Sequence, residues 1–318
     1  MTCVNWFRAF KKDLEGEIPD VPFQMLTALP LTNAHWAQIA ENATWTQTRM
    51  NLNTFARHDV FSDTKLTKLV ADKLQDEEQV KRAKVFPYQV YTAYQNVDAK
   101  VPAKVTVALQ KSADLALANI PEFEGQVYVL VDTSGSMKSP VTGHRGSVTT
   151  KTTCVDVAAL VASAVLRKNP DTKVIPFDTS VHDVRLNPMD SIVTNAQTLA
   201  KFGGGGTNCS EALASINRKN GKGDLVIYVS DNESWVDNSG YGRGTATMAE
   251  WNKYKVRNPN AKLVCIDITP NSTSQVHDRE DILNIGGFSD QVFDVIARFV
   301  ELGNNKDLWV KTIESVTL

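Results

Sequence analysis

The sequence predicts an α/β domain with a parallel sheet and helices on both faces, preceded by a segment built only of helices. After residue 120, four runs rich in β-branched residues alternate with stretches of helical periodicity. The runs are nearly continuous in apolar residues, as is typical of strands buried on both faces. Before residue 120 the pattern is helical throughout. We therefore place a helical segment at residues 1–120 and the α/β domain at residues 121–318.

Apolar residues recur at helical spacing in the first 120 residues. Thr32 and Thr46 precede two of these stretches and are N-cap candidates, since their hydroxyls accept from the first free backbone N–H groups. A proline suits the first turn of a helix, so Pro87 is expected to open another. We expect four to six helices in this part of the chain. The candidates are residues 33–43, 47–58, 64–84 and the stretch that follows Pro87.

The second part of the chain reads as repeated strand–helix units. Its predicted strands are residues 126–132, 172–178, 224–231 and 261–268. Its predicted helices are residues 154–168, 210–219, 246–256 and 289–303. Such alternation builds parallel sheets, and ligands of these sheets bind at the carboxyl ends of strands, where the strand order reverses.

Hydroxyl and carboxylate side chains fall at these carboxyl ends. The turn "DTSGSM" (132–137) follows the first strand, "GGGGTN" (203–208) precedes a helix, and "SDNES" (230–234) follows a later strand. If the first strand and the 224–231 strand are neighbours, the three loops converge. We expect Gly135 to relieve the first turn. The predicted site residues are Asp132, Ser134, Ser136, Thr207 and Asp231.

An oxygen-only ligand set suits a hard divalent cation, Mg²⁺, Mn²⁺ or Ca²⁺. Hydroxyl ligands leave such an ion short of negative charge, so it is expected to take an acidic group from outside. No phosphate-binding G-x-x-x-x-G-K-[ST] motif is present, which argues against a nucleotide site. The alternative is structural, because Ser and Thr in these positions also cap helices.

This constellation resembles the metal-ion-dependent adhesion site of von Willebrand factor A domains. That pattern is D-x-S-x-S, then a Thr, then an Asp, and every position is matched. The resemblance implies a Rossmann-like fold from about residue 124 to residue 318. It also implies a divalent cation, usually Mg²⁺, with a coordination site open to a partner's acidic group. It points to metal-dependent binding and not to catalysis.

Further segments resemble the Ro ribonucleoprotein autoantigen family. "VIYVSDNESW", "AKLVCIDITP" and "GGFSDQVFDVIARF" are similar to its C-terminal half, and "ATWTQTRMNLNTFARHDVF" to the end of its TROVE module, a ring of HEAT-like helical hairpins. The resemblance implies binding of small noncoding RNAs and a role in RNA quality control. A full ring needs at least about twice the helical sequence present, so we expect a shortened member whose single chain does not close a ring.

RNA binding requires cations that contact phosphates. Residues 1–120 hold 14 Lys and Arg against 13 Asp and Glu, so the segment has no general basic field. Local clusters are candidates, with solvated helix faces as the alternative. Two polar loops near the metal motif add an arginine each. The RNA-contact candidates are Arg49, Arg57, His58, Lys65, Lys68, Lys81, Arg82, Lys84, Arg145 and Arg243.

Composition excludes other classes of protein. The net charge is −2, the four cysteines are scattered, and no run approaches the roughly 18 apolar residues of a membrane helix. The five histidines lack the spacing of metalloproteases or deaminases, so no enzyme activity is expected. We expect a cytoplasmic protein. Three roles stay open: an RNA-binding component, a metal-dependent protein adhesion module without RNA, and a homo-oligomeric assembly unit. In the last, the apolar edge of the helical segment pairs or is covered by Trp6, Phe7 and Phe10.

Overall fold

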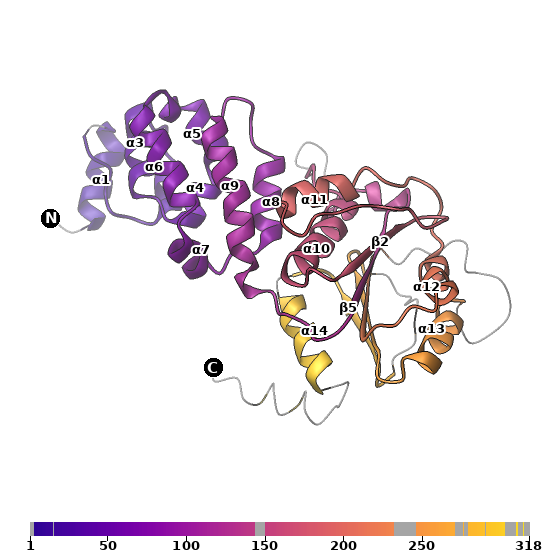
Figure 1. Cartoon of the computed structure of the whole chain (residues 1–318). Helices are drawn as coiled ribbons and strands as arrows, with labels where there is room; N and C mark the ends of the chain where they lie inside the picture. The colour runs from indigo at the N-terminus through magenta and orange to yellow at the C-terminus, as the bar shows by residue number, and fades with distance from the viewer. Residues whose placement is uncertain are drawn as a thin grey trace. The chain divides into compact units, whose positions relative to one another are not determined.

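Helices alone make up the first part of the chain, and strands begin only at residue 127. The computed structural model describes residues 3–14, 16–143, 150–231, 246–270, 276, 279–289, 291–302, 310 and 314 (Figure 1). The chain divides into two units, Met1–Ala116 and Leu117–Leu318. The sequence places this boundary after residue 120, within a few residues of the division seen. No helix among the described residues is long and apolar enough to span a bilayer.

Within its described residues the first unit has more helices than expected. They are α1 (Cys3–Asp13), α2 (Phe23–Thr27), α3 (Asn33–Asn42), α4 (Trp45–Met50), α5 (Leu52–Arg57), α6 (Thr64–Leu74), α7 (Glu77–Ala83), α8 (Pro87–Gln95) and α9 (Ala103–Leu115). A short 3₁₀ turn, η1 (Val60–Ser62), lies within the unit, and a second, η2 (Ala116–Asn119), begins at the unit's last residue. The expectation of four to six helices was wrong: two predicted helices are each divided in two, and α1, α2 and α9 lie outside the stretches that the sequence singled out.

A polar residue whose side chain binds the backbone lies at each interruption. Asp76 begins α7, and its carboxylate accepts a hydrogen bond from the backbone N–H of Gln79. Asn51 separates α4 from α5 in the same stretch of sequence. Thr32 caps α3 as expected, whereas Thr44 and not Thr46 caps α4. Local hydrogen bonds from Asx and Thr side chains therefore divide what apolar periodicity alone reads as continuous helix.

The aromatic residues of α1 only partly fulfil the covering role that the sequence suggested. Phe10 is buried and makes an edge-to-face contact with His35 of α3, with ring centroids 5.2 Å apart. Trp6 is exposed, and Phe7 is half-buried. One aromatic side chain thus fastens α1 to the helical unit.

The second unit contains a five-stranded parallel sheet in the order β2-β1-β3-β4-β5. Its strands are β1 (Val127–Asp132), β2 (Lys173–Phe177), β3 (Leu225–Ser230), β4 (Lys262–Asp267) and β5 (Ile282–Gly286). The predicted fold class is confirmed, and four strands lie where the sequence placed them. The fifth was missed because Asn284 and Gly286 interrupt its apolar pattern.

Helices cover both faces of the sheet, as Figure 1 shows for α10 and α11 on one side and α12 and α13 on the other. These helices are α10 (Cys154–Lys168), α11 (Ile192–Leu199), α12 (Cys209–Arg218) and α13 (Ala246–Arg257), and α14 (Gln291–Leu302) follows β5. Every residue of β1 and β3 is buried. The sheet order reverses between β1 and β3, so the crevice expected for a ligand lies at their carboxyl ends.

Candidate metal centre

Asp132 ends β1 and is held by two hydrogen bonds. The backbone N–H of Ser134 donates to its Oδ1 at 2.8 Å, and the Ser230 hydroxyl at the end of β3 donates to its Oδ2 at 2.6 Å. Asp132 is fully buried, and the serines beside it are nearly so. The expected convergence of the first and third strands thus takes the form of a direct side-chain bond between them.

The two serines of the first loop present neighbouring hydroxyls. Ser134 Oγ lies 3.2 Å from Ser136 Oγ, so both oxygens face the same small volume. Gly135 between them has a φ of −60° and ψ of −37°, which any residue adopts. The expectation that Gly135 relieves a strained turn was therefore wrong. Its backbone instead lies close to the glycine loop, and its N–H donates to the carbonyl of Gly205 at 2.9 Å.

The glycine loop, residues 203–206, lies directly on the first loop. Gly203 has a φ of +83°, and a Cβ atom there would lie 1.9 Å from the carbonyl oxygen of Thr133. The N–H of Gly204 donates to that same oxygen at 2.9 Å. Only a residue without a side chain permits this approach. Thr207 follows the loop and is buried.

Asp231 follows β3 and is also buried. Burial raises the pKa of the Asp132 carboxyl to about 6, against the hydrogen bonds from Ser230 and Ser134, and the charge of Asp231 adds to the rise. The buried thiol of Cys154, at the start of α10, has its pKa raised to about 12 by burial and then by the charges of Asp231 and Asp132. The charge of Asp231 is thus felt at both Asp132 and Cys154.

This donor set fits a hard divalent cation. Two buried carboxylates repel each other, and a cation between them removes both the repulsion and the cost of burying charge. The other donors are hydroxyl oxygens, which suit Mg²⁺, Mn²⁺ or Ca²⁺. In the described part of the chain no group of three His, Cys, Asp or Glu side chains is arranged to hold a metal, so an ion here would need the hydroxyls of Ser134, Ser136 and Thr207 as ligands.

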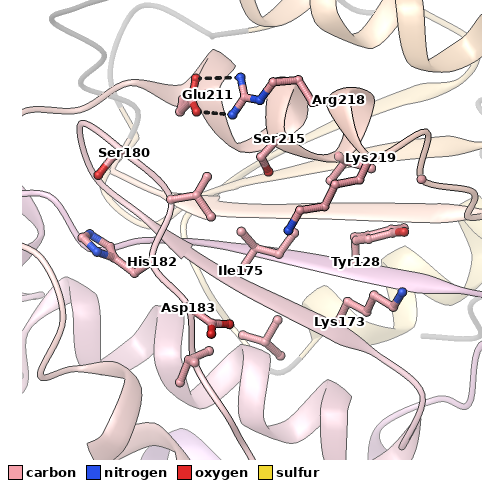
Figure 2. Close-up of a pocket in the computed structure, with 15 residues that line it drawn as sticks. Tyr128, Lys173, Ile175, Ser180, His182, Asp183, Glu211, Ser215, Arg218 and Lys219 are labelled. Carbon is pink, nitrogen blue, oxygen red and sulfur yellow. Dashed lines mark hydrogen bonds and ion pairs between the residues drawn. The ribbon is translucent and has the colours of Figure 1, made fainter.

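A groove of about 690 Å³ lies beside β2, between α12 and the segment 180–184 (Figure 2). Ile175 and Ile216 form part of its apolar wall, and Lys173 lies over the ring of Tyr128. His182 faces the groove, and its Nε2 lies 3.0 Å from Oδ1 of Asp178, in ion-pair contact but without hydrogen-bond geometry. The residues that line the groove do not include the five predicted metal ligands. His182, which lines the groove, contacts Asp178, and Asp178 accepts a hydrogen bond from Gly205 of the glycine loop.

Most of the candidate RNA-contact residues lie at the surface of the helical unit. The exposed ones are Arg57, Lys65, Lys68, Lys81, Arg82 and Lys84. Lys68 is paired with Asp72, and Lys81 with Glu77 at 2.7 Å. Such exposed pairs are weak, so both cations stay accessible to a phosphate. Arg145 and Arg243 lie outside the described residues.

Arg49 and His58 are half-buried and make contacts within the helical unit. The guanidinium of Arg49 lies over the ring of Trp45 and donates to the carbonyl of Gln89 at 2.9 Å. Burial lowers its pKa. His58 stacks on Trp36, with ring centroids 5.1 Å apart. Arg49 and His58 thus join helices of the unit to one another.

Sequence reasoning missed two residues of the site, Ser230 and Asp178. Ser230 directly precedes Asp231 in "VSD", and a hydroxyl at the end of a strand beside the motif was the available signal. Asp178 ends the predicted strand "TKVIPFD" and is likewise polar at the ligand-binding edge. Neither residue belongs to the pattern of D-x-S-x-S, then a Thr, then an Asp, so the motif did not identify them.

The fold agrees with that of known proteins. A family model described as the Ro60 vWA domain matches residues 126–300. A crystal structure of the RO (RSR) protein of Deinococcus radiodurans is similar over 94% of this chain, with a TM-score of 0.68 and 19% sequence identity. The match covers 60% of that protein, so the chain spans less than two thirds of its length. At this identity the structural match concerns the fold.

Proposed function

This chain belongs to the Ro60 von Willebrand factor A domain family, and from that membership we propose that it is a noncatalytic, RNA-binding component of ribonucleoprotein particles. The observation that carries the proposal is the family match over residues 126–300. The RNA would be a small structured RNA, bound mainly through its phosphates. The exposed cations of α5, α6 and α7 support this, because phosphate contacts supply most of the affinity for RNA.

The proposal includes a divalent cation at Asp132, Ser134, Ser136, Thr207 and Asp231. Both carboxylates are buried at the carboxyl ends of β1 and β3, and the serine hydroxyls lie side by side. A bound Mg²⁺ would supply an open coordination position for an oxygen ligand from outside. In keeping with a noncatalytic role, His35 contacts Thr32, His58 stacks on Trp36, and His182 lies against Asp178.

Fluorescence anisotropy with a labelled structured RNA tests RNA binding. We expect binding at low salt that weakens steeply as salt increases, since phosphate contacts release counterions. Nucleic acid that co-purifies with the protein, seen as a raised 260/280 nm absorbance ratio, would agree. If no RNA of this kind binds even at low salt, RNA binding is not the function.

A second candidate is metal-dependent protein adhesion. Gly135 and the glycine loop are exposed at the mouth of the site, so an acidic side chain of a partner can reach the ion. Chelation separates the two candidates. In adhesion, EDTA releases the protein partner, whereas RNA held by the helical unit stays bound. If EDTA releases neither, the ion contacts no ligand.

A further inference from the structure

Asp178, the residue directly after β2, makes contacts that no RNA or metal motif accounts for. It is buried, and its carboxylate accepts hydrogen bonds from two backbone N–H groups. Ser180 donates to Oδ1 at 3.1 Å, and Gly205 donates to Oδ2 at 3.2 Å. Burial alone would raise the pKa of Asp178, but these bonds and the neighbouring His182 hold it below its usual value. The carboxylate is thus an acceptor inside the protein.

The contacts of Asp178 enclose the metal-ligand candidate Thr207. The carboxylate binds Gly205, two residues before Thr207, and the backbone carbonyl of Asp178 accepts from the N–H of Asn208 at 2.9 Å, one residue after it. The hydroxyl of Thr179 donates to the carbonyl of Gly206 at 3.2 Å. The position of the Thr207 backbone is therefore determined by two consecutive residues at the end of β2.

Gly205 also connects this attachment to the serine loop. Its N–H donates to Asp178, and its carbonyl accepts from Gly135, which lies between Ser134 and Ser136. A Cβ atom at Gly205 would lie 2.8 Å from Thr179 Oγ1 and 3.0 Å from Asp178 Oδ2, so the two segments are in close contact. A single residue, Gly205, is thus held through its N–H by Asp178 and through its carbonyl by the first metal loop.

We propose that Asp178 is a positioning residue of the cation site, which acts by holding the glycine loop so that Thr207 meets the other ligands. The inference rests on the cation site proposed above. Residues that orient metal ligands through such contacts typically change metal affinity by roughly 10- to 100-fold when they are replaced. This route needs no direct contact between the carboxylate and the ion, because Asp178 holds the loop through the backbone N–H of Gly205.

The test is a double-mutant cycle on the full chain, with Mg²⁺ affinity measured by calorimetry. Asp178→Asn keeps the side-chain shape but replaces one acceptor oxygen by an NH₂ group, and we expect Mg²⁺ affinity to fall roughly 10-fold or more. Thr207→Val removes the hydroxyl ligand. If Asp178 acts through Thr207, then Asp178→Asn has little further effect in the Thr207→Val background. If Asp178 only stabilises the fold, the fold-changes in Mg²⁺ affinity caused by the two substitutions would multiply in the double variant.

Two further variants keep the result interpretable. Asp183→Asn removes a charge from the same segment, at an exposed carboxylate that lines the groove in Figure 2, and should leave Mg²⁺ affinity within about twofold. Thr179→Val removes only the bond from an exposed residue to Gly206 and should weaken Mg²⁺ binding about threefold, even if Asp178→Asn does not fold.

The outcomes separate this inference from the cation site itself. Wild-type protein that fails to bind Mg²⁺ overturns both. Wild-type protein that binds Mg²⁺ supports the site, and the positioning role then fails if Asp178→Asn binds equally well or if its effect multiplies with that of Thr207→Val. An unfolded Asp178→Asn variant together with an unchanged Thr179→Val variant also overturns it.

Discussion

The hydroxyl of Ser230 donates a 2.6 Å hydrogen bond to Oδ2 of Asp132 and so joins the carboxyl ends of β3 and β1 at the point where the strand order reverses. Both residues are buried. The bond lowers the cost of keeping a carboxylate in the interior, a cost that is visible in the raised pKa of Asp132. The site thus contains a strand-to-strand contact that is independent of any metal.

Replacing Ser230 with alanine tests this contact. A hydrogen bond to a charged group contributes about 1.5–3 kcal/mol, so Ser230→Ala should reduce the free energy of unfolding at pH 7 by about that amount in EDTA. Ser215→Ala is the matched control, because Ser215 is also buried but donates only to the carbonyl of Ala212 in its own helix. Urea unfolding curves give both values. Equal losses for the two variants would contradict the account.

Asp132→Asn should abolish Mg²⁺ binding while leaving the metal-free fold intact. The amide is neutral, so it removes the attraction for a cation and also the cost of burying a charge. We therefore expect calorimetry to detect no Mg²⁺ binding, and thermal unfolding in EDTA to occur at a temperature equal to or above that of the wild type. Normal Mg²⁺ binding by this variant would show that the site is misplaced.

The candidate RNA contacts divide into two classes that mutation should separate. Lys65→Ala and Arg82→Ala remove exposed cations, so each should weaken RNA binding and reduce the slope of log affinity against log salt by about 1. Arg49→Ala removes a half-buried guanidinium that lies over Trp45 and donates to Gln89. It should lower the melting temperature and leave the salt slope unchanged. If Arg49→Ala changes the salt slope and Lys65→Ala does not, the division into RNA-contact and structural residues is wrong.

An ion-paired carboxylate beside β5 predicts a pH dependence of stability. Asp281 accepts from Arg279 and from Trp251 Nε1, and Lys255 lies 3.4 Å away. Burial acts to raise its pKa, but the hydrogen bonds from Arg279 and Trp251 outweigh it, and the pKa is lowered. A lowered pKa in the folded protein means stability that is present above the unfolded value and lost as pH falls through the folded one.

Asp281→Asn should therefore destabilise the protein on the order of 1 kcal/mol at pH 7, an amount reduced by solvent screening at this partly exposed site. The difference from the wild type should shrink as pH falls from about 5 towards 2, where the wild-type carboxyl also becomes neutral. Urea unfolding curves of both proteins at several pH values measure this difference in the free energy of unfolding. A difference that does not change with pH would mean that the side chain contributes through packing and not through charge.

The sequence predicted four of the five strands and the candidate metal motif, because both depend on local pattern. Continuous apolar runs indicate buried strands, and "DTSGSM" places three oxygen donors on one turn. The helix breaks at Asn51 and Asp76 were missed, because apolar periodicity continues through a capped interruption. The Asn51 side chain donates to the carbonyl of Gln47, and the Asp76 side chain accepts from the N–H of Gln79. Apolar periodicity carries no information about such side-chain bonds to the backbone.

The supporting contacts of the site were beyond the reach of sequence for a different reason. Asp178 and Gly205 are 27 residues apart, and their hydrogen bond depends on how β2 lies beside β1. The sequence identified the polar residue at each strand end but not which of them touch. The motif therefore predicted the candidate ligands, and the fold supplied the residues that hold them in place.

Gly203 provides a test of how closely the two loops must pack. Its φ of +83° disfavours a side chain, and a Cβ atom would overlap the Thr133 carbonyl. Gly203→Ala should reduce the free energy of unfolding by more than about 2 kcal/mol, from strain and overlap together. It should also weaken Mg²⁺ binding, because Thr207 and the serine loop move apart.

Gly287→Ala is the matched control, since its φ is +81° but nothing lies within 4 Å of the new atom. It should cost about 1 kcal/mol and leave Mg²⁺ affinity unchanged. If both variants bind Mg²⁺ equally well, contact between the glycine loop and the serine loop is not needed for the site.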